Sequence, residues 1–226
     1  NFNNETSYKG LNDYSSYGEQ FAEEFAKSGL TINEVLNSNS PYPYTSAPAL
    51  YTYLIDTVTI NGVTQVKAAP EYILDAGQAL QQEMLKSTKG GIYELAIGFA
   101  HNSNEKWYIG ATIGIPLINY ESNTVFMESD TSANTSNHFK QFTYTDNFKT
   151  KGTGGNVKIG IIYRPKDYIR LGLAIHTPTY MFLKDTRTTN LSTAVENPVE
   201  FFNVSSQTFT NNQPGEARYI QSSPFK

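Results

Sequence analysis

The chain has 226 residues, a formal net charge of −4 and 17% charged residues, together with 16 Tyr, 13 Phe and 1 Trp. Many aromatic residues and few charges argue against a disordered chain, and the lack of a large basic block argues against a nucleic-acid partner. The chain has no cysteine, which excludes disulfides, cysteine nucleophiles and thiolate metal sites. No apolar run approaches the roughly 18–20 residues of a membrane-spanning helix.

The first third of the chain, residues 1–89, predicts a segment rich in loops and helices. Apolar residues recur at helical spacing between Ser15 and Ser28, and Ser28-Gly29 supplies a stop. A second helix is predicted from Pro70 to Ser87, with an apolar stripe of Tyr72, Ile73, Ala76, Leu80 and Met84. Between these helices, residues 49–60 read as extended and Asn61-Gly62 as a hairpin turn.

Residues 90–226 predict a series of strands separated by polar turns and loops. Short turns are expected at 102–105, 151–155 and 165–167, and a longer Ser/Thr/Asn-rich loop at 131–137. The expected strands are 92–101, 106–117, 119–130, 138–150, 156–164, 168–179, 180–191, 199–209 and 217–222. Short and long connections alternate, as in antiparallel barrels that have tight turns on one side.

The strands share one asymmetry between their two faces. In residues 107–117 the odd positions carry Trp, Ile, Ala, Ile, Ile and Leu, whereas the even positions carry Tyr, Gly, Thr, Gly and Pro. The same split returns in residues 157–164 and 169–176. Because side chains alternate across a strand, each segment has one apolar face and one face of small or polar residues. An apolar outer face and a polar or small inner face are typical of a transmembrane β-barrel.

One long stretch resembles a known family. Residues 152–179 are similar to a hairpin of the FadL/TodX-type outer-membrane transporters, in which a strand ending in Tyr-Arg-Pro is followed by a short turn and then by Arg-Leu-Gly-Leu. Here these motifs are Tyr163-Arg164-Pro165 and Arg170-Leu171-Gly172-Leu173. Residues 90–95 and 108–116 resemble the family less specifically.

The resemblance implies an all-β fold, an antiparallel transmembrane barrel of about fourteen strands in a complete member. It implies a monomer in the bacterial outer membrane, surrounded by lipid or detergent, that takes up long-chain fatty acids or other hydrophobic small molecules by passive binding and diffusion. The family's N-terminal hatch and its closing aromatic-ended strand have no counterpart in residues 1–226. We therefore expect residues 1–226 to be part of a single barrel domain, with 1–89 rich in loops and helices and 90–226 forming barrel strands.

Four charged or titratable residues fall on the small-residue face: Glu94, Lys158, Arg170 and His176. If this face lines a lumen, Lys158 and Arg170 would meet the carboxylate of a fatty acid. The competing interpretation is an internal ion pair, for instance between Lys158 and Glu94.

The two predicted helices offer a second candidate site. As extracellular loop helices they would form an apolar groove that captures the ligand, made of Phe21, Phe25, Tyr72, Ile73 and Leu80. Simple packing of these side chains is the competing interpretation.

Nothing in the sequence points to an enzyme, a metal or a cofactor. His101, His138 and His176 lack metal-ligand spacing, Gly152-Thr153-Gly154-Gly155 lacks the Lys-Ser/Thr of a phosphate loop, and no Gly-x-Ser-x-Gly elbow occurs. Two alternatives to a transporter stay open. One is a soluble extracellular β-sandwich of the adhesin type, and the other is a barrel wall that binds no substrate.

Overall fold

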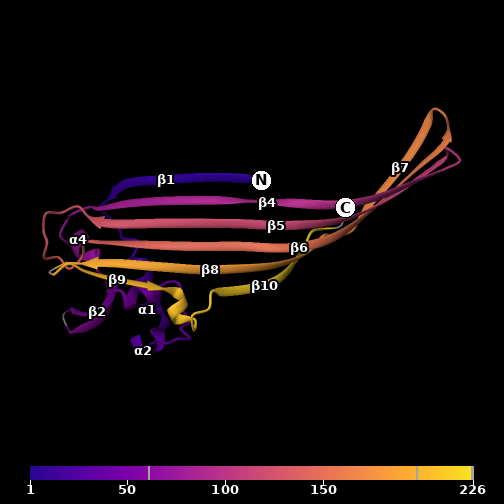
Figure 1. Cartoon of the computed structure of the whole chain (residues 1–226). Helices are drawn as coiled ribbons and strands as arrows, with labels where there is room; N and C mark the ends of the chain where they lie inside the picture. The colour runs from indigo at the N-terminus through magenta and orange to yellow at the C-terminus, as the bar shows by residue number, and fades with distance from the viewer. Residues whose placement is uncertain (61, 197, 225–226) are drawn as a thin grey trace.

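The computed structural model describes residues 1–60, 62–196 and 198–224, and most of them lie in antiparallel strands (Figure 1). The main sheet has the order β1-β4-β5-β6-β8-β10, with β7 paired to β6 and β9 paired to β8. The strands are β1 (Phe2–Asn12), β4 (Leu80–Ser103), β5 (Trp107–Asp130), β6 (Gln141–Lys166), β7 (Ile169–His176), β8 (Tyr180–Val195), β9 (Glu200–Ser205) and β10 (Gly215–Ser222). The predicted antiparallel β class is confirmed. The described strands form an open sheet, so closure into a barrel stays a prediction.

The central strands are longer than predicted. β4 and β5 pair without interruption, from Leu80 opposite Asp130 at one end to Ser103 opposite Trp107 at the other. The predicted turn at 151–155 is wrong, because these residues continue β6. The reason lies in the contacts of Gly152 and Gly154: a Cβ at either position would clash with a carbonyl oxygen of the neighbouring strand. These glycines allow a close strand approach instead of a turn.

β7 and β8 follow one another along the same side of β6 and are joined by residues 177–179, which belong to no strand. His176 lies opposite Lys158, and Tyr180 lies opposite Gly155. In this connection, Thr177 Oγ1 accepts a hydrogen bond of 2.9 Å from the backbone N–H of Val157. Figure 1 shows the end of the sheet that carries β7 curving away from the rest.

A mainly helical segment lies between β1 and β4. It contains α1 (Glu19–Ser28), α2 (Ile32–Val35), α3 (Ser46–Tyr51), the hairpin of β2 (Ile55–Ile60) and β3 (Val63–Ala68), and α4 (Glu71–Asp75); a 3₁₀ turn, η1 (Ser206–Phe209), lies after β9. None of the described helices combines the length and the hydropathy of a membrane-spanning helix.

The helix predictions for this segment are confirmed in part. The first predicted helix is confirmed as α1. The second is wrong beyond Asp75, because residues 80–87 belong to β4 and pair with both β1 and β5. Residues 49–51 are helical and not extended. The predicted hairpin is confirmed by the β2–β3 register, although Asn61 itself lies outside the described residues. Residues 1–89 also hold more strand than expected, since β1 and the start of β4 belong to the main sheet.

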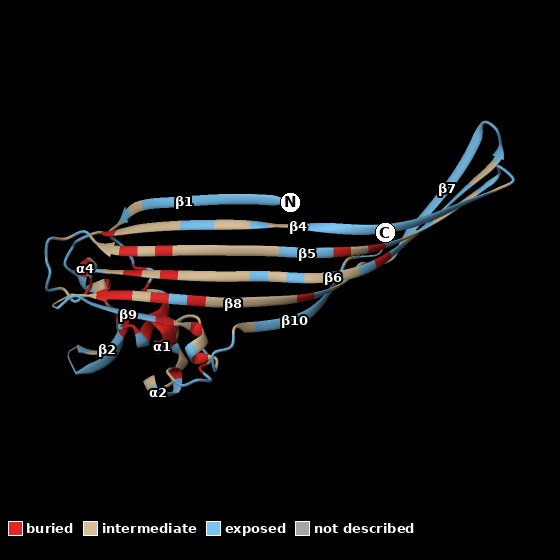
Figure 2. Cartoon of the chain, in the orientation of Figure 1, coloured by how far each residue is buried: buried red, intermediate tan, exposed pale blue. Residues whose placement is uncertain are grey.

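The hydrophobic core forms where this helical segment packs on the sheet. Tyr17 stacks on Phe126 with ring centroids 4.3 Å apart, and Phe21 lies 5.5 Å from Tyr144. Figure 2 shows buried residues gathered at this end of the sheet, whereas the β7 end is mostly exposed. Burying one such apolar side chain contributes about 1.5–3 kcal/mol, so this interface holds the helical segment in place.

Candidate functional site

The sheet has two halves with different surroundings. The turn-side half comprises β7 and residues 92–103 of β4, 107–117 of β5, 153–166 of β6, 180–182 of β8 and 220–222 of β10; the helix-side half comprises the rest of these strands with β1 and β9. We call the face on which the helical segment packs the inner face, and the opposite face the outer face. Strand alternation places Phe126 and Phe142 on the same inner face as Gly114 and Lys158.

In the turn-side half the outer face is an apolar band that the described part of the chain leaves uncovered. Ile113 is 55% exposed and Leu173 is 65% exposed. The cross-strand register joins the band across β5, β6 and β7, since Ile109 lies opposite Ile161 and Ile161 lies opposite Leu173. The larger members of the band are Tyr93, Leu95, Ile97, Phe99, Trp107, Ile109, Ile113, Ile115, Leu117, Val157, Ile159, Ile161, Tyr163, Leu171, Leu173 and Ile175.

The band ends at the border with the helix-side half. The last row of the band runs across the sheet as Tyr93, Leu117, Thr153, Phe182 and Ile220. Two residues further along each strand, the next outer-face row is Gly91, Asn119, Lys151, Lys184 and Arg218. β5, β8 and β10 thus change from apolar to polar within one step of their alternation, whereas the last row has Thr153 on β6 and the next row has Gly91 on β4. Neighbouring strands change together because the register aligns them.

Aromatic side chains mark both ends of the band. At the turns, Trp107 stacks on Tyr163 with ring centroids 4.3 Å apart. At the other end, Tyr93 and Phe182 lie in the last apolar row. Both are more than half exposed.

The inner face of the turn-side half carries an ion pair that crosses three strands. Lys158 Nζ on β6 donates to Glu94 Oε1 on β4 at 2.7 Å. β5 passes between them, with Gly114 beside Asn156, and a Cβ at Gly114 would clash with Glu94 Oε1 and lie 2.6 Å from Asn156 Oδ1. Glycine at this position therefore leaves the space through which Glu94 reaches Lys158. Asn156 is buried, and its Oδ1 has no hydrogen-bond partner among the described residues.

The structure brings together three of the four predicted inner-face residues. His176 lies directly opposite Lys158 on β7, beside the Glu94 pair. Arg170 lies six residues earlier on β7, about 20 Å away along the strand, next to the turn between β6 and β7. The competing interpretation of an ion pair between Lys158 and Glu94 therefore describes the observed contact, and Arg170 lies apart from it.

Most of the predicted capture residues lie inside the core. Phe21, Phe25, Ile73 and Leu80 are buried, so in this structure they offer no surface to a ligand. These side chains are buried because the sheet packs over them, and the helical periodicity of the sequence alone could not show this contact. Tyr72 remains partly exposed and lines a hollow of about 280 Å³, where Lys67 Nζ lies 4.2 Å from the centre of its ring.

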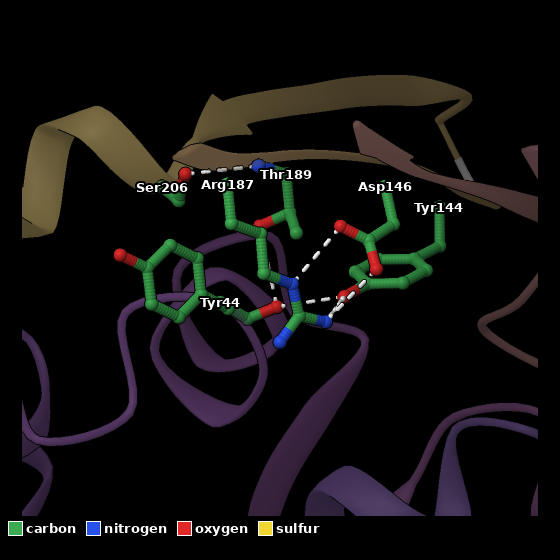
Figure 3. Close-up of polar contacts among 6 residues, drawn as sticks. All are labelled: Tyr44, Tyr144, Asp146, Arg187, Thr189 and Ser206. Atoms are coloured by element: carbon green, nitrogen blue, oxygen red, sulfur yellow. Dashed lines mark hydrogen bonds and ion pairs between the residues drawn. The ribbon is translucent and has the colours of Figure 1, made fainter. Parts of the chain in front are cut away.

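A polar cluster that the sequence did not indicate fastens the helical segment to the sheet (Figure 3). Arg187 on β8 donates to both carboxylate oxygens of Asp146 on β6, at 3.0 and 2.9 Å. The hydroxyls of Tyr144 and Thr189 donate to the backbone carbonyl of Tyr44, at 3.0 and 3.2 Å. These groups satisfy one another, so the cluster acts as a clamp.

Burial raises the pKa of the Tyr144 hydroxyl in this clamp, and Asp146 acts in the same direction. Tyr144 therefore stays protonated and keeps its hydrogen bond to Tyr44. The only signal for the clamp in the sequence is a single arginine in a Thr-rich strand, because its partner Asp146 is 41 residues away.

No group of His, Asp and Glu among the described residues is arranged to hold a metal ion. No protein-family model and no curated protein sequence matches the chain. The functional argument therefore rests on the geometry of the two faces of the sheet.

Proposed function

We propose that this chain forms part of the wall of an outer-membrane β-barrel that lets hydrophobic small molecules, such as long-chain fatty acids, pass by passive binding and diffusion. The observation that carries the proposal is the border on the outer face, where β5, β8 and β10 change from apolar to polar at one level. If the band were part of a protein core, a second layer of protein would cover it. If the band faces lipid, the acyl chains cover it, and it needs only a uniform height across the strands.

The height of the band supports a membrane. From Trp107 to Leu117, β5 rises about 33 Å at roughly 3.3 Å per residue. At the usual barrel tilt of about 35–45° this corresponds to a layer near 25 Å, the height of the apolar band in outer-membrane barrels. Aromatic residues at both ends of the band match the two interfacial girdles of such barrels.

The connections suggest an orientation. Outer-membrane barrels have short turns on the periplasmic side and longer connections outside the cell. The connections β4–β5 and β6–β7 are short, and both lie at the turn-side end. The helical segment and residues 131–140 connect strands at the other end. In the proposed orientation the helical segment therefore lies on the extracellular side.

Trp107 is the only tryptophan of the chain and tests the membrane placement directly. Its fluorescence is measured in vesicles whose lipids carry bromine at defined depths of the acyl chain. We expect strong quenching by bromine near the headgroups and weaker quenching by bromine at the chain ends, because Trp107 lies at the edge of the band. A protein that stays soluble without detergent, with fluorescence that brominated vesicles do not change, would contradict the proposal and favour the soluble sandwich.

The inner-face ion pair offers a site at which the carboxylate of a ligand can compete with Glu94 for Lys158. Lys158 and Glu94 are both about one-third exposed, so an incoming carboxylate can exchange with Glu94 for the ammonium group. Binding of a fluorescent fatty acid then has to respond in opposite directions to two changes. Lys158→Gln should weaken binding several-fold, and Glu94→Gln should strengthen it by a similar factor.

A barrel wall without a substrate is the second candidate, and the satisfied ion pair favours it. If the wall binds no substrate, no saturable fatty-acid binding is found, and both substitutions change only the stability of the sheet. Arg170→Gln is the matched control, because Arg170 lies on the same face about 20 Å from the pair. An equal loss of binding in the control variant would assign the effect to overall inner-face charge.

A further inference from the structure

Basic residues collect on the outer face directly beyond the apolar band. Lys151, Lys184 and Arg218 lie in one row across three neighbouring strands, and Lys89 and Lys149 lie in the row beyond it. Neighbouring strands are about 4.8 Å apart, so the three cations of the first row stand within reach of one phosphate group or of two adjacent ones. We call these five residues the basic border.

The acidic residues in the same two rows neutralise this charge only in part. Glu121 pairs with Lys89 at 3.0 Å and with Lys149 at 3.5 Å. Glu216 pairs with Lys184 at 2.5 Å and with Arg218 at 3.8 Å. Five cations against two acids leave a local charge of +3 on a chain whose net charge is −4. Arg218 retains a side-chain exposure of 75%, and Lys151 is exposed and belongs to none of the ion pairs of the described residues.

The basic border adjoins apolar surface without a gap. Phe182 and Ile220 lie two residues from Lys184 and Arg218, about 7 Å along the strands. These four residues line a surface hollow of about 410 Å³, together with Leu183 and Tyr219. A molecule with a phosphate group and an acyl chain can contact both the cations and the apolar side chains of this surface, whereas a free anion can contact only the cations.

We propose that the basic border binds the phosphate groups of lipids in the leaflet next to the helical segment, with their acyl chains on the apolar band. The inference rests on the proposed membrane placement and adds a specific lipid class to it. Charge complementarity and continuity with the band select this occupant: the cations stand at the level where lipid headgroups begin.

The test counts bound lipids on the protein in nanodiscs of phosphatidylcholine with added lipid A, a doubly phosphorylated glycolipid. Native mass spectrometry measures the lipid A molecules that stay bound after release from the disc. The combined variant Lys151→Gln, Lys184→Gln and Arg218→Gln should lower the apparent affinity about a hundredfold, since each cation near a charged leaflet contributes about fivefold. Glu216→Gln should raise the affinity, because it removes the acid that competes for Lys184.

The matched control is Lys86→Gln. Lys86 lies three residues from Lys89 on β4 but on the inner face, so its loss should leave lipid A binding unchanged. Equal retention of lipid A by the combined variant and the unaltered protein would overturn the inference. Inorganic phosphate that displaces lipid A at similar concentration would overturn the commitment to a lipid.

Trp107 quenching in discs of the same composition, prepared with brominated phosphatidylcholine, separates the two proposals. If the protein inserts but shows no preference for lipid A, only the proposed binding of lipid phosphate at the basic border is contradicted. A protein that does not insert contradicts both proposals, because the border then has no leaflet beside it.

Discussion

The two halves of the sheet use the same strands and the same alternation to meet different surroundings. In the helix-side half, the inner face packs Phe126 and Phe142 against the helical segment and the outer face is mainly polar. In the turn-side half, the outer face is the apolar one, and the inner face carries glycines and the Glu94–Lys158 pair. The apolar side changes from one face to the other along a continuous strand. The comparison teaches that alternation alone does not tell which face is covered by protein.

Truncation of a core side chain should have the largest effect on the free energy of unfolding, and it distinguishes most directly between the two halves of the sheet. Phe142 is fully buried under the helical segment, and Phe142→Ala should destabilise the protein by about 3–5 kcal/mol. Ile159→Ala on the outer face of the same strand should cost about 1 kcal/mol in vesicles, because lipid fills the space that the side chain leaves. Urea unfolding in vesicles, followed by tyrosine and tryptophan fluorescence, measures both. Equal losses would mean that the band packs against protein.

A charge placed in the band sharpens the same comparison. Ile113→Arg puts a cation in the middle of the apolar band and should cost about 2–4 kcal/mol in vesicles. Thr145→Arg puts the same side chain on the outer face of the helix-side half, where we expect a change below about 1 kcal/mol. The equilibrium between folded, inserted protein and unfolded protein in urea is the measurement. If Ile113→Arg is tolerated as well as Thr145→Arg, the band does not meet hydrocarbon.

The inner face offers a smaller effect at Gly114. Gly114→Ala would push Glu94 Oε1 and Asn156 Oδ1 away, so it should break the ion pair with Lys158 at a cost of about 1 kcal/mol. Gly155→Ala is the control, since a Cβ there meets nothing within 4 Å. Urea unfolding of each variant alone and combined with Lys158→Gln gives the coupling between the two sites. Additive losses would show that Gly114 does not serve the ion pair.

The sequence predicted the features that repeat within one strand and missed those set by distant partners. Alternation in residues 107–117 is local, so the apolar face was found from the sequence. Leu80 and Met84 are four residues apart, a spacing that fits a helix turn as well as alternate positions of a strand; pairing with β1 and β5 decides for the strand. The glycines at 152–155 looked like a turn because their contacts with Phe182 and Tyr180 involve another strand. The Arg187–Asp146 clamp was missed for the same reason.

The smallest predicted effect contrasts two carboxylates of β5 on opposite faces of the helix-side half. Glu128 is buried on the inner face, where it accepts hydrogen bonds from Ser16 Oγ at 2.6 Å and Gln82 Nε2 at 2.7 Å, and burial raises its pKa. Glu121 is on the outer face, and the hydrogen bond from Lys89 lowers its pKa.

These opposite shifts predict opposite pH trends. The raised pKa of Glu128 means that the folded state binds its proton more tightly than the unfolded state, so its contribution to stability grows as the pH falls from neutral through that pKa. The lowered pKa of Glu121 gives stability that is present above the pKa of the unfolded carboxyl and is lost as the pH falls through the folded one. In the unaltered protein, acidification should therefore increase the amide-exchange protection of the helical segment through Glu128, and Glu128→Gln should abolish this increase. Acidification should also lower the free energy of unfolding in urea through Glu121, and Glu121→Gln should abolish this decrease. The same sign in both variants would contradict the assignment of Glu128 to the protein-covered face and of Glu121 to the outer face beside the basic border. Only a difference in surroundings separates these two residues of one strand.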